Sequence, residues 1–378
     1  MNHIALIRSA SSAVSKKQYN IQEIGMAKEL SRLGMKVDVF LISDTGKTYK
    51  EEIKDNVRVY WLKGIKIPGQ QGYYKDLKKI LDCNEYDMIQ ALDDSQITTV
   101  LVSYYCKNRG IKFVLWQGMY ENYQEMYKKI IQRLFDFTLL KILKKNTKYC
   151  IAKTTSARKY LEMKGFHNAK VIPVGLAIEN FANESRIDYR LKLNIPEGYK
   201  ILLYVGKVEE RRKPIFCLDV FAEVKKMYKD CCLVYVGNGP MLEETHSYVE
   251  KHGYKDIYFV DKIPQKELSS LYEEASLFIL PTRYEIFGMV LMEAMYFKLP
   301  VITYKAAGPL DIIENNIDGI VMDNFDSKKW ANKILLHIKD KNYFEEMGIK
   351  GRKKIINNYL WPHIGKMYYE EYRNIIEH

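Results

Sequence analysis

Short apolar runs recur along the chain, and stretches with helical spacing of apolar residues lie between them. The stretch Ile21–Leu33 has this helical spacing and is followed by Gly34, a residue that commonly ends a helix. Strand and helix patterns that alternate in this way predict a parallel sheet covered by helices on both faces. The strands predicted in the first half of the chain are Ile4–Ile7, Lys36–Leu41, Val57–Leu62, Met88–Gln90, Lys112–Trp116 and Tyr149–Lys153.

The alternation stops once and then restarts, which divides the chain. Residues 179–198 are polar and rich in Asn, as expected for a linker. They separate a domain at 1–178 from a second at 199–357, each plausible as a doubly wound α/β domain. Residues 358–378 have helical spacing and are predicted to form a terminal helix that crosses back to the first domain. The strands predicted in the second half are Lys200–Val205, Leu233–Val236, Ile257–Phe259, Leu277–Leu280, Pro300–Thr303 and Ile320–Met322.

Composition narrows the kind of protein only slightly. The net charge of +12 implies an acidic partner such as nucleic acid, a membrane surface or a phosphorylated substrate, and fits a solvated Lys-rich surface equally well. The six cysteines form no CxxC pair and no His cluster has metal-ligand spacing, so we expect a reduced cytoplasmic chain without a metal. We find neither a signal-peptide pattern nor an apolar stretch of membrane-spanning length.

The chemistry is predicted at the segment that follows the strand Leu277–Leu280. A turn containing Glu285 leads to Gly288, where a helix carrying Glu293 begins. A helix N-terminus has unpaired backbone N–H groups and a positive dipole end, so it suits a diphosphate. Glu285 can reach hydroxyls of a bound sugar, and Glu293 can accept two hydrogen bonds from a vicinal diol such as ribose. Two surface glutamates that bracket a core helix are the alternative.

This segment resembles the E-x7-E signature of the retaining family-four glycosyltransferases (glycosyl transferases group 1). Other runs resemble that family in the same order along the chain. The resemblance implies the GT-B fold, with two Rossmann-like domains and a cleft between them. It also implies a nucleotide diphosphate sugar donor, no metal or cofactor, and bacterial polysaccharide-type chemistry. The runs that carry the resemblance are Val171–Leu176, Tyr204–Lys207, Glu210–Pro214, Val236–Pro240, Ile263–Pro264 and Tyr359–Trp361.

The resemblance also assigns roles to individual residues. Lys207 and either Arg212 or Lys213 would contact the diphosphate and the negative charge that develops on it. Glu285 would hold donor-sugar hydroxyls, and Glu293 would hold the ribose. No protein nucleophile is required, because attack from the same face retains the anomeric configuration. Further donor contacts are expected from Gly206, Asn238, Ile263, Phe287, Gly288, Met289 and Val290.

The first domain departs from the family pattern at two places. The loop after the first strand has small residues, among them Ser12, where the family often has paired glycines. A loop position where many members carry His holds Gln117, which can hydrogen-bond a sugar but cannot exchange a proton. Ser12 and Gln117 are therefore the candidate contacts from this domain.

Residues 126–148 combine helical apolar spacing with seven Lys or Arg residues. A basic amphipathic helix of this kind binds an anionic membrane interface, and a core helix with a solvated basic face gives the same pattern. The first interpretation predicts a peripheral position on the inner face of the cell membrane.

We therefore expect a hexose-type transfer from a nucleotide diphosphate sugar to a glycan or lipid-linked glycan in capsule, O-antigen or exopolysaccharide synthesis. A GT-B sugar-nucleotide epimerase or hydrolase is one alternative. A basic nucleotide- or RNA-binding protein is another, although the chain lacks the usual nucleic-acid-reading motifs, so we expect no nucleic-acid partner. A Rossmann dehydrogenase is disfavoured, because no G-x-G-x-x-G fingerprint opens the first domain.

Overall fold

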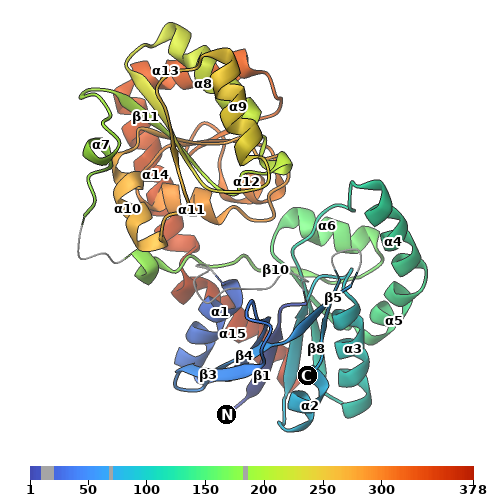
Figure 1. The fold of residues 1–378 in the computed structure, drawn as a ribbon. Helices are drawn as coiled ribbons and strands as arrows, with labels where there is room; N and C mark the ends of the chain where they lie inside the picture. Colours follow the sequence, from blue (N-terminus) through green and yellow to red (C-terminus); the bar gives the residue numbers. More distant parts are fainter. Residues whose placement is uncertain (10–20, 68–70, 182–185) are drawn as a thin grey trace. The chain divides into compact units, whose positions relative to one another are not determined.

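The structure is a computed structural model that describes residues 1–9, 21–67, 71–181 and 186–378. The chain forms two compact units. Unit 1 contains Met1–Ala177 together with Leu360–His378, and unit 2 contains Ile178–Tyr359. Each unit has a mostly parallel sheet with helices packed on both faces (Figure 1). The predicted α/β class is confirmed.

The main sheet of unit 1 has eight strands in the order β10-β9-β8-β7-β1-β2-β4-β3. All neighbours are parallel except β3, which pairs antiparallel with β4. The central strands are buried along their whole length, which explains why they are apolar runs without alternation. The strands of unit 1 are β1 (His3–Ile7), β2 (Lys36–Ile42), β3 (Tyr49–Lys54), β4 (Val57–Leu62), β5 (Gly64–Ile67), β6 (Gln71–Tyr74), β7 (Met88–Leu92), β8 (Lys112–Gln117), β9 (Tyr149–Ala152) and β10 (Lys170–Val171).

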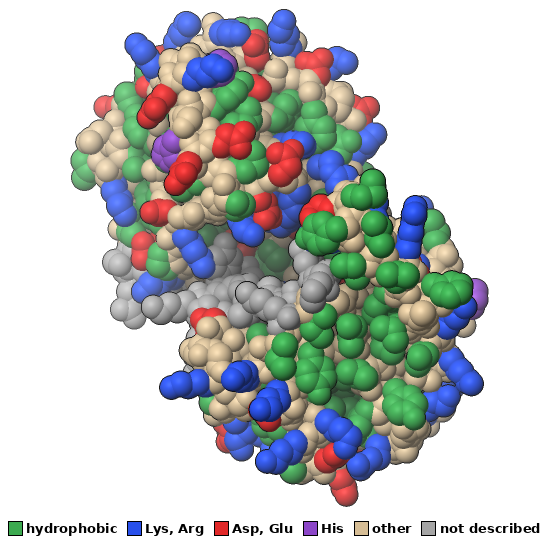
Figure 2. All heavy atoms as spheres, turned by 45° about the vertical axis from the view of Figure 1, so that its right-hand side comes forward, with side chains coloured by type: hydrophobic (Ala, Val, Ile, Leu, Met, Phe, Trp, Pro, Cys, Tyr) green, Lys and Arg blue, Asp and Glu red, His purple; other side chains and the backbone are tan. Residues whose placement is uncertain are grey.

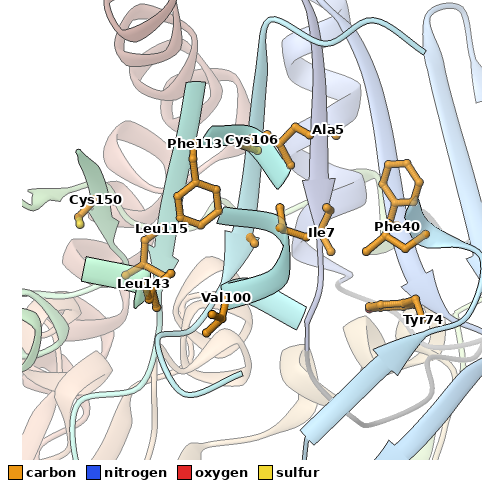
Figure 3. Packing of buried hydrophobic residues seen from close by; sticks show 14 of the residues in the cluster. Ala5, Ile7, Phe40, Tyr74, Val100, Cys106, Phe113, Leu115, Leu143 and Cys150 are labelled. Atoms are coloured by element: carbon orange, nitrogen blue, oxygen red, sulfur yellow. The ribbon is translucent and has the colours of Figure 1, made fainter. Parts of the chain in front are cut away.

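The core of unit 1 lies between this sheet and the helices that cover it. Figure 3 shows Ile7, Phe113 and Leu115 of the sheet in one cluster with Val100 and Leu143 of two covering helices. The separate β5–β6 hairpin adds Tyr74 to the same cluster. The helices of unit 1 are α1 (Gln22–Arg32), α2 (Leu77–Asp82), α3 (Ile97–Arg109), α4 (Met126–Phe137), α5 (Leu139–Asn146), α6 (Thr155–Met163) and α15 (Trp361–Glu377).

The terminal helix α15 is part of unit 1 because its apolar face is buried there. The hydroxyl of Tyr368 accepts a 2.8 Å hydrogen bond from the Trp116 indole and donates to the Ile172 carbonyl. The hydroxyl of Tyr372 donates to the Gln90 amide oxygen at 2.6 Å. These buried polar contacts fix how far α15 slides along the unit, which apolar packing alone would not do.

Unit 2 contains a six-stranded, fully parallel sheet in the order β13-β12-β11-β14-β15-β16. This is a doubly wound order: successive strands are added toward one edge from β11 to β13, and toward the other edge from β14 to β16. The strands are β11 (Lys200–Val205), β12 (Cys231–Val236), β13 (Ile257–Val260), β14 (Leu277–Leu280), β15 (Val301–Tyr304) and β16 (Ile320–Met322). The helices are η1 (Ile178–Phe181), α7 (Tyr189–Lys192), η2 (Glu210–Arg212), α8 (Pro214–Met227), α9 (Leu242–His252), α10 (Gln265–Glu274), α11 (Met289–Tyr296), α12 (Ala307–Ile312), α13 (Ser327–Lys339) and α14 (Lys341–Asn358).

Two expectations need correction. Part of the expected linker 179–198 is packed structure, because Tyr189 is fully buried and its backbone N–H donates to Glu274 of α10 at 3.1 Å. The expected single helix at 126–148 is two helices, α4 and α5, which meet at Thr138. Thr138 has φ −112° and ψ −76°, outside regular helix geometry, and its hydroxyl donates to the Leu134 carbonyl.

Candidate active site

The candidate site lies at the carboxyl ends of β11 and β14 in unit 2. These strands are neighbours in the sheet, and Leu202 and Leu203 pair with Leu277 and Phe278. The segments that leave them run toward opposite sides, because the strand order reverses at this point. In open α/β sheets a crevice forms at such a reversal, and ligands bind there. Both predicted motifs, the basic run and the glutamate turn, follow these two strands.

The loop after β11 is supported by the glycines that follow β12. A Cβ atom on Gly237 would lie 1.9 Å from the Gly206 carbonyl oxygen, and Gly237 has φ +143°. Only glycine permits that approach in that conformation. The Val208 N–H donates to the Asn238 carbonyl at 3.1 Å, which ties the two loops together. The Gly-Asn-Gly run therefore positions the basic loop, and the Asn238 side chain is exposed and donates to Asp261.

The register of the basic run is decided by which side chains turn toward Glu285. Arg212 is largely buried, and its Nη1 lies 3.2 Å from Glu285 Oε2. Arg211 Nη1 lies 3.8 Å from the same oxygen and donates to the Tyr284 carbonyl at 2.7 Å. Lys213 turns away, because its backbone is left-handed (φ +52°) and its Nζ pairs with Glu210. The structure brings Arg212 to the glutamate turn, and does not bring Lys213 there.

Lys207 belongs to the same loop but points toward solvent. Its side chain is 61% exposed, and its Nζ lies 3.0 Å from Glu209 Oε2. Glu209 also accepts a 2.5 Å hydrogen bond from Arg211. Partial burial would raise the pKa of Glu209, but the neighbouring Arg211 and Lys207 hold that pKa below its ordinary value. Glu209 therefore stays ionised and holds two cations beside the strand ends.

The glutamate turn is fixed by its main chain. Glu285 is nearly buried, and its carbonyl accepts the Gly308 N–H at 3.1 Å. Phe287 is buried next to the Tyr359 ring, with ring centroids 6.1 Å apart. Gly288 then adopts φ +97° as the N-cap residue of α11. The turn can therefore present Glu285 beside the start of the helix.

The start of α11 offers backbone donors. The carbonyl of Gly288 accepts the N–H groups of Leu291 and Met292, as expected for the first turn. The N–H groups of the first helical residues, Met289 and Val290, have no place in the helix ladder. Together with the helix dipole they form a region that favours an anion. Arg212 supplies a positive charge near the adjoining turn through its contact with Glu285.

Glu293 lies in the second turn of α11 and is fully buried. It accepts a 2.9 Å hydrogen bond from the Tyr272 hydroxyl and a 3.3 Å hydrogen bond from the Gln265 side-chain amide. Both donors come from α10, which begins two residues after the buried Ile263. These two hydrogen bonds hold the Glu293 carboxylate against α10.

The sequence reasoning missed four residues here, namely Glu209, Arg211, Gln265 and Tyr272. Glu209 and Arg211 were visible as part of one charged run, but their partners depend on how η2 folds back. Gln265 and Tyr272 are seven positions apart in α10 and thus share one helix face, which is a signal that the sequence contains.

The candidate contacts from the first domain lie in unit 1. Ser12 is outside the described residues. Gln117 is fully buried, donates to Asp94 Oδ1 and the Met119 carbonyl, and accepts the Asp94 N–H. Burial raises the pKa of Asp94 to about 7. Gln117, at the end of β8, therefore holds the buried carboxyl group of Asp94, which follows β7. Its side-chain amide is engaged within unit 1.

Among the residues that the structure describes, no three His, Cys, Asp or Glu side chains are grouped so that they could hold a metal ion. None of their helices combines the length and the apolar character needed to cross a bilayer.

Comparison with known proteins finds a family model that matches most of unit 2. Residues 185–354 match the profile of the family described as "Glycosyl transferases group 1". A probable sucrose-phosphate synthase from Thermosipho melanesiensis is 36% identical over 215 residues, which are 55% of this chain and 47% of that protein. The capsular polysaccharide biosynthesis glycosyltransferase CapM of Staphylococcus aureus is 26% identical over 62% of this chain and 66% of its own. The chain spans about half the length of the first curated relatives that it matches, between 38% and 51%.

Solved structures extend the likeness of the fold to the whole chain. Sucrose-phosphate synthase from Thermosynechococcus elongatus has a TM-score of 0.79 at 19% identity, with all of both chains covered. Anabaena HepE in complex with UDP-glucose has a TM-score of 0.75 at 16% identity, covering 98% of this chain and 99% of its own. At these identities the likeness concerns the fold.

Proposed function

We propose that this chain, whose fold is the GT-B fold, belongs to the glycosyl transferases group 1 family, whose model matches residues 185–354, and that it transfers a sugar from a nucleotide diphosphate donor with retention of configuration. One observation carries the proposal. Arg212, after β11, meets Glu285, after β14, beside the first turn of α11 at the point where the strand order reverses. That arrangement supports a site for a sugar joined to a diphosphate.

In the proposed mechanism, the protein stabilises the departing nucleoside diphosphate. Arg212 and Lys207 supply positive charge, and the N–H groups of Met289 and Val290 donate to phosphate oxygens. Such preorganised donors are worth more in a site without bulk water than in solution. These groups neutralise the leaving group without a metal ion. The leaving phosphate oxygen takes the acceptor's proton, so no protein nucleophile is needed.

Glu285 and Glu293 orient the donor. The carboxylate of Glu285, held by Arg212, accepts hydrogen bonds from sugar hydroxyls. Glu293 accepts hydrogen bonds from the ribose diol. The longer, 3.3 Å bond that Gln265 donates to Glu293 breaks when the diol binds. Tyr272 keeps the carboxylate in place during that exchange. Both roles remain proposals that the contacts around the two glutamates support.

For the acceptor we propose a glycan or lipid-linked glycan of a cell-surface polysaccharide, with a hexose-type sugar as the donor group. CapM, one of the relatives, is described as a glycosyltransferase of capsular polysaccharide biosynthesis. A sugar-nucleotide epimerase or hydrolase of the same fold would turn over the donor without an acceptor. Donor consumption that depends on an added glycan acceptor would exclude it.

We further propose that the protein binds the inner face of the cell membrane through α4 and α5. Their outward side carries exposed apolar side chains, whereas cations such as Arg133 and Lys145 are exposed around them. Each basic residue near an anionic surface contributes about 1 kcal/mol. The exposed apolar side chains on the two helices are Met126, Tyr127, Ile130, Leu134, Phe137 and Ile142.

The donor site can be tested by a matched pair of variants, Arg212→Ala and Lys213→Ala. They are adjacent and carry the same charge, but only Arg212 reaches Glu285. A thermal-shift screen against UDP-, GDP- and dTDP-sugars first identifies the donor, because a ligand stabilises the state that binds it. Arg212→Ala should then weaken donor binding by about 10–100-fold, the value of a charged hydrogen bond. Equal loss in both variants would refute the assignment.

A further inference from the structure

Unit 1 contains an elongated apolar groove that has no role in the proposed transfer. Its volume is about 410 Å³, within the roughly 300–1,000 Å³ of small-molecule sites. Leu77 and Leu81 of α2 and Val102 of α3 form its buried floor. Leu101 and Tyr104 of α3 lie along its open side, 48% and 56% exposed. The groove is thus lined by apolar side chains and still reached from solvent.

The shape of the groove suits a flexible chain. Its lining on α3 extends from Thr98 to Arg109, which at 1.5 Å per residue is about 16 Å. That is about half the thickness of the hydrocarbon region of a bilayer. Leu77 and Leu81 are one helical turn apart on α2, about 6 Å, and line the groove from one face of that helix. A linear hydrocarbon chain fills such a space better than a compact ring does.

The groove has cations at its rim. Lys78 and Arg109 both line it, with side chains 77% and 54% exposed, and both pair with Asp82. Two cations around one carboxylate leave a net positive charge, which complements a phosphate headgroup. Lys107 and Arg109 also lie in the last turn of α3, where the helix dipole favours cations.

The groove lies near the surface proposed to bind the membrane. Helix α3 lines the groove and packs against α5, one of the two helices of that surface. Figure 2 shows hydrophobic side chains gathered over one face of unit 1, with Lys and Arg around them. Exposed apolar surface of this extent marks a binding site for a protein or a membrane. The basic surroundings favour an anionic membrane.

From these observations we infer that the groove binds the hydrocarbon chain of a phosphate-bearing lipid, with the phosphate at Lys78 and Arg109. The inference rests on the membrane association proposed above. It adds a lipid site in unit 1 to the donor site of unit 2. The occupant that we propose is an anionic phospholipid of the membrane.

The test uses dodecyl phosphate below its micellar concentration, titrated calorimetrically into the full chain. We expect saturable binding at one site, and no competition from inorganic phosphate, which lacks the chain. Leu101→Asp places a charge in the apolar wall and should weaken binding about tenfold or more. Because Leu101 is half exposed, the change spares the core. The matched control is Leu336→Asp, at a 66% exposed leucine of α13 in unit 2.

Two further arms separate the possible failures. Lys78→Ala should weaken the binding of dodecyl phosphate more than the binding of uncharged dodecanol, because only dodecyl phosphate has a phosphate group. Leu134→Asp on α4 should reduce binding to vesicles of anionic phospholipid while leaving dodecyl phosphate binding intact. Equal affinity in Leu101→Asp and wild type, many weak sites, or a dimer that Leu101→Asp dissociates would overturn the inference. Titration of the nucleotide sugar into the same samples shows separately whether the donor site holds.

Discussion

The packing of α15 against α1 predicts the effect of adding one methyl group at Gly25. A Cβ atom there would lie 2.2 Å from Nε1 and 2.5 Å from Cε2 of Trp361. Non-bonded carbon atoms prefer about 3.5–4.0 Å, so either the indole or the whole helix must move by more than about 1 Å. Trp361 is 5% exposed, so its rigid ring has no open space to turn into. Gly25→Ala should therefore loosen α15.

The magnitude follows from two opposing effects. Alanine in the interior of a helix is more favourable than glycine by about 1 kcal/mol. Overfilling a packed core costs about 1–3 kcal/mol. The steric effect is at the upper end here, because the contact is with a ring and not with a flexible side-chain end. We expect a net loss of about 1–2 kcal/mol, a factor of roughly 5–30 in the opening equilibrium.

Hydrogen exchange read by mass spectrometry is the appropriate measurement, because a two-unit protein need not unfold in one step. Peptides of α1 and α15 should exchange faster in Gly25→Ala, and peptides of unit 2 should not change. In a Trp361→Ala background, which lacks the whole indole ring, the same change should be neutral or stabilising by up to about 1 kcal/mol. Equal loss in both backgrounds would show that the Trp361 contact is not the cause.

Three other predictions concern single residues. Tyr372→Phe removes the buried hydrogen bond to Gln90 and should lower the free energy of opening of unit 1 by about 1–2 kcal/mol. Hydrogen exchange in unit 1 should then be faster, with unit 2 as the internal control. Burial raises the pKa of Asp94 to about 7, so folded Asp94 keeps a proton that the unfolded chain releases above about pH 4. Unit 1 should therefore lose stability as pH rises from about 4 to 7, and Asp94→Asn should flatten that part of a urea-denaturation profile. Gly237→Ala meets the Gly206 carbonyl at 1.9 Å and should weaken donor binding, measured by calorimetry, while α15 exchange is unchanged.

Much of the fold could be predicted because the inner strands of both sheets are buried along their length. Residues of such strands are continuously apolar, and the runs at Lys200–Val205 and Leu277–Leu280 are β11 and β14 with the predicted bounds. Strand β3 was not predicted. It is an edge strand with the sequence Tyr-Lys-Glu-Glu-Ile-Lys, and none of its residues is buried. Its pairing with β4 depends on the backbone and leaves little apolar signal.

The candidate site was predictable where function follows from position in the chain. Gly288 does precede α11, and Glu285 does lie in the turn before it. Contacts that depend on packing were not predictable. Whether Arg212 or Lys213 faces Glu285 depends on the left-handed residue that ends η2. Likewise, the hydrogen bond between Tyr272 and Glu293 requires α10 and α11 to lie together.

Unit 2 is inserted into unit 1, and this affects the order of folding during synthesis. The chain leaves unit 1 after Ala177 and returns at Leu360, where Leu360 pairs with Leu176 and the Trp361 N–H donates to the Leu176 carbonyl. A ribosome therefore makes all of unit 2 before it makes the helix that completes unit 1. Domains generally fold as units while the chain emerges. Unit 2 can thus finish folding first, while unit 1 waits with the surface for α15 uncovered.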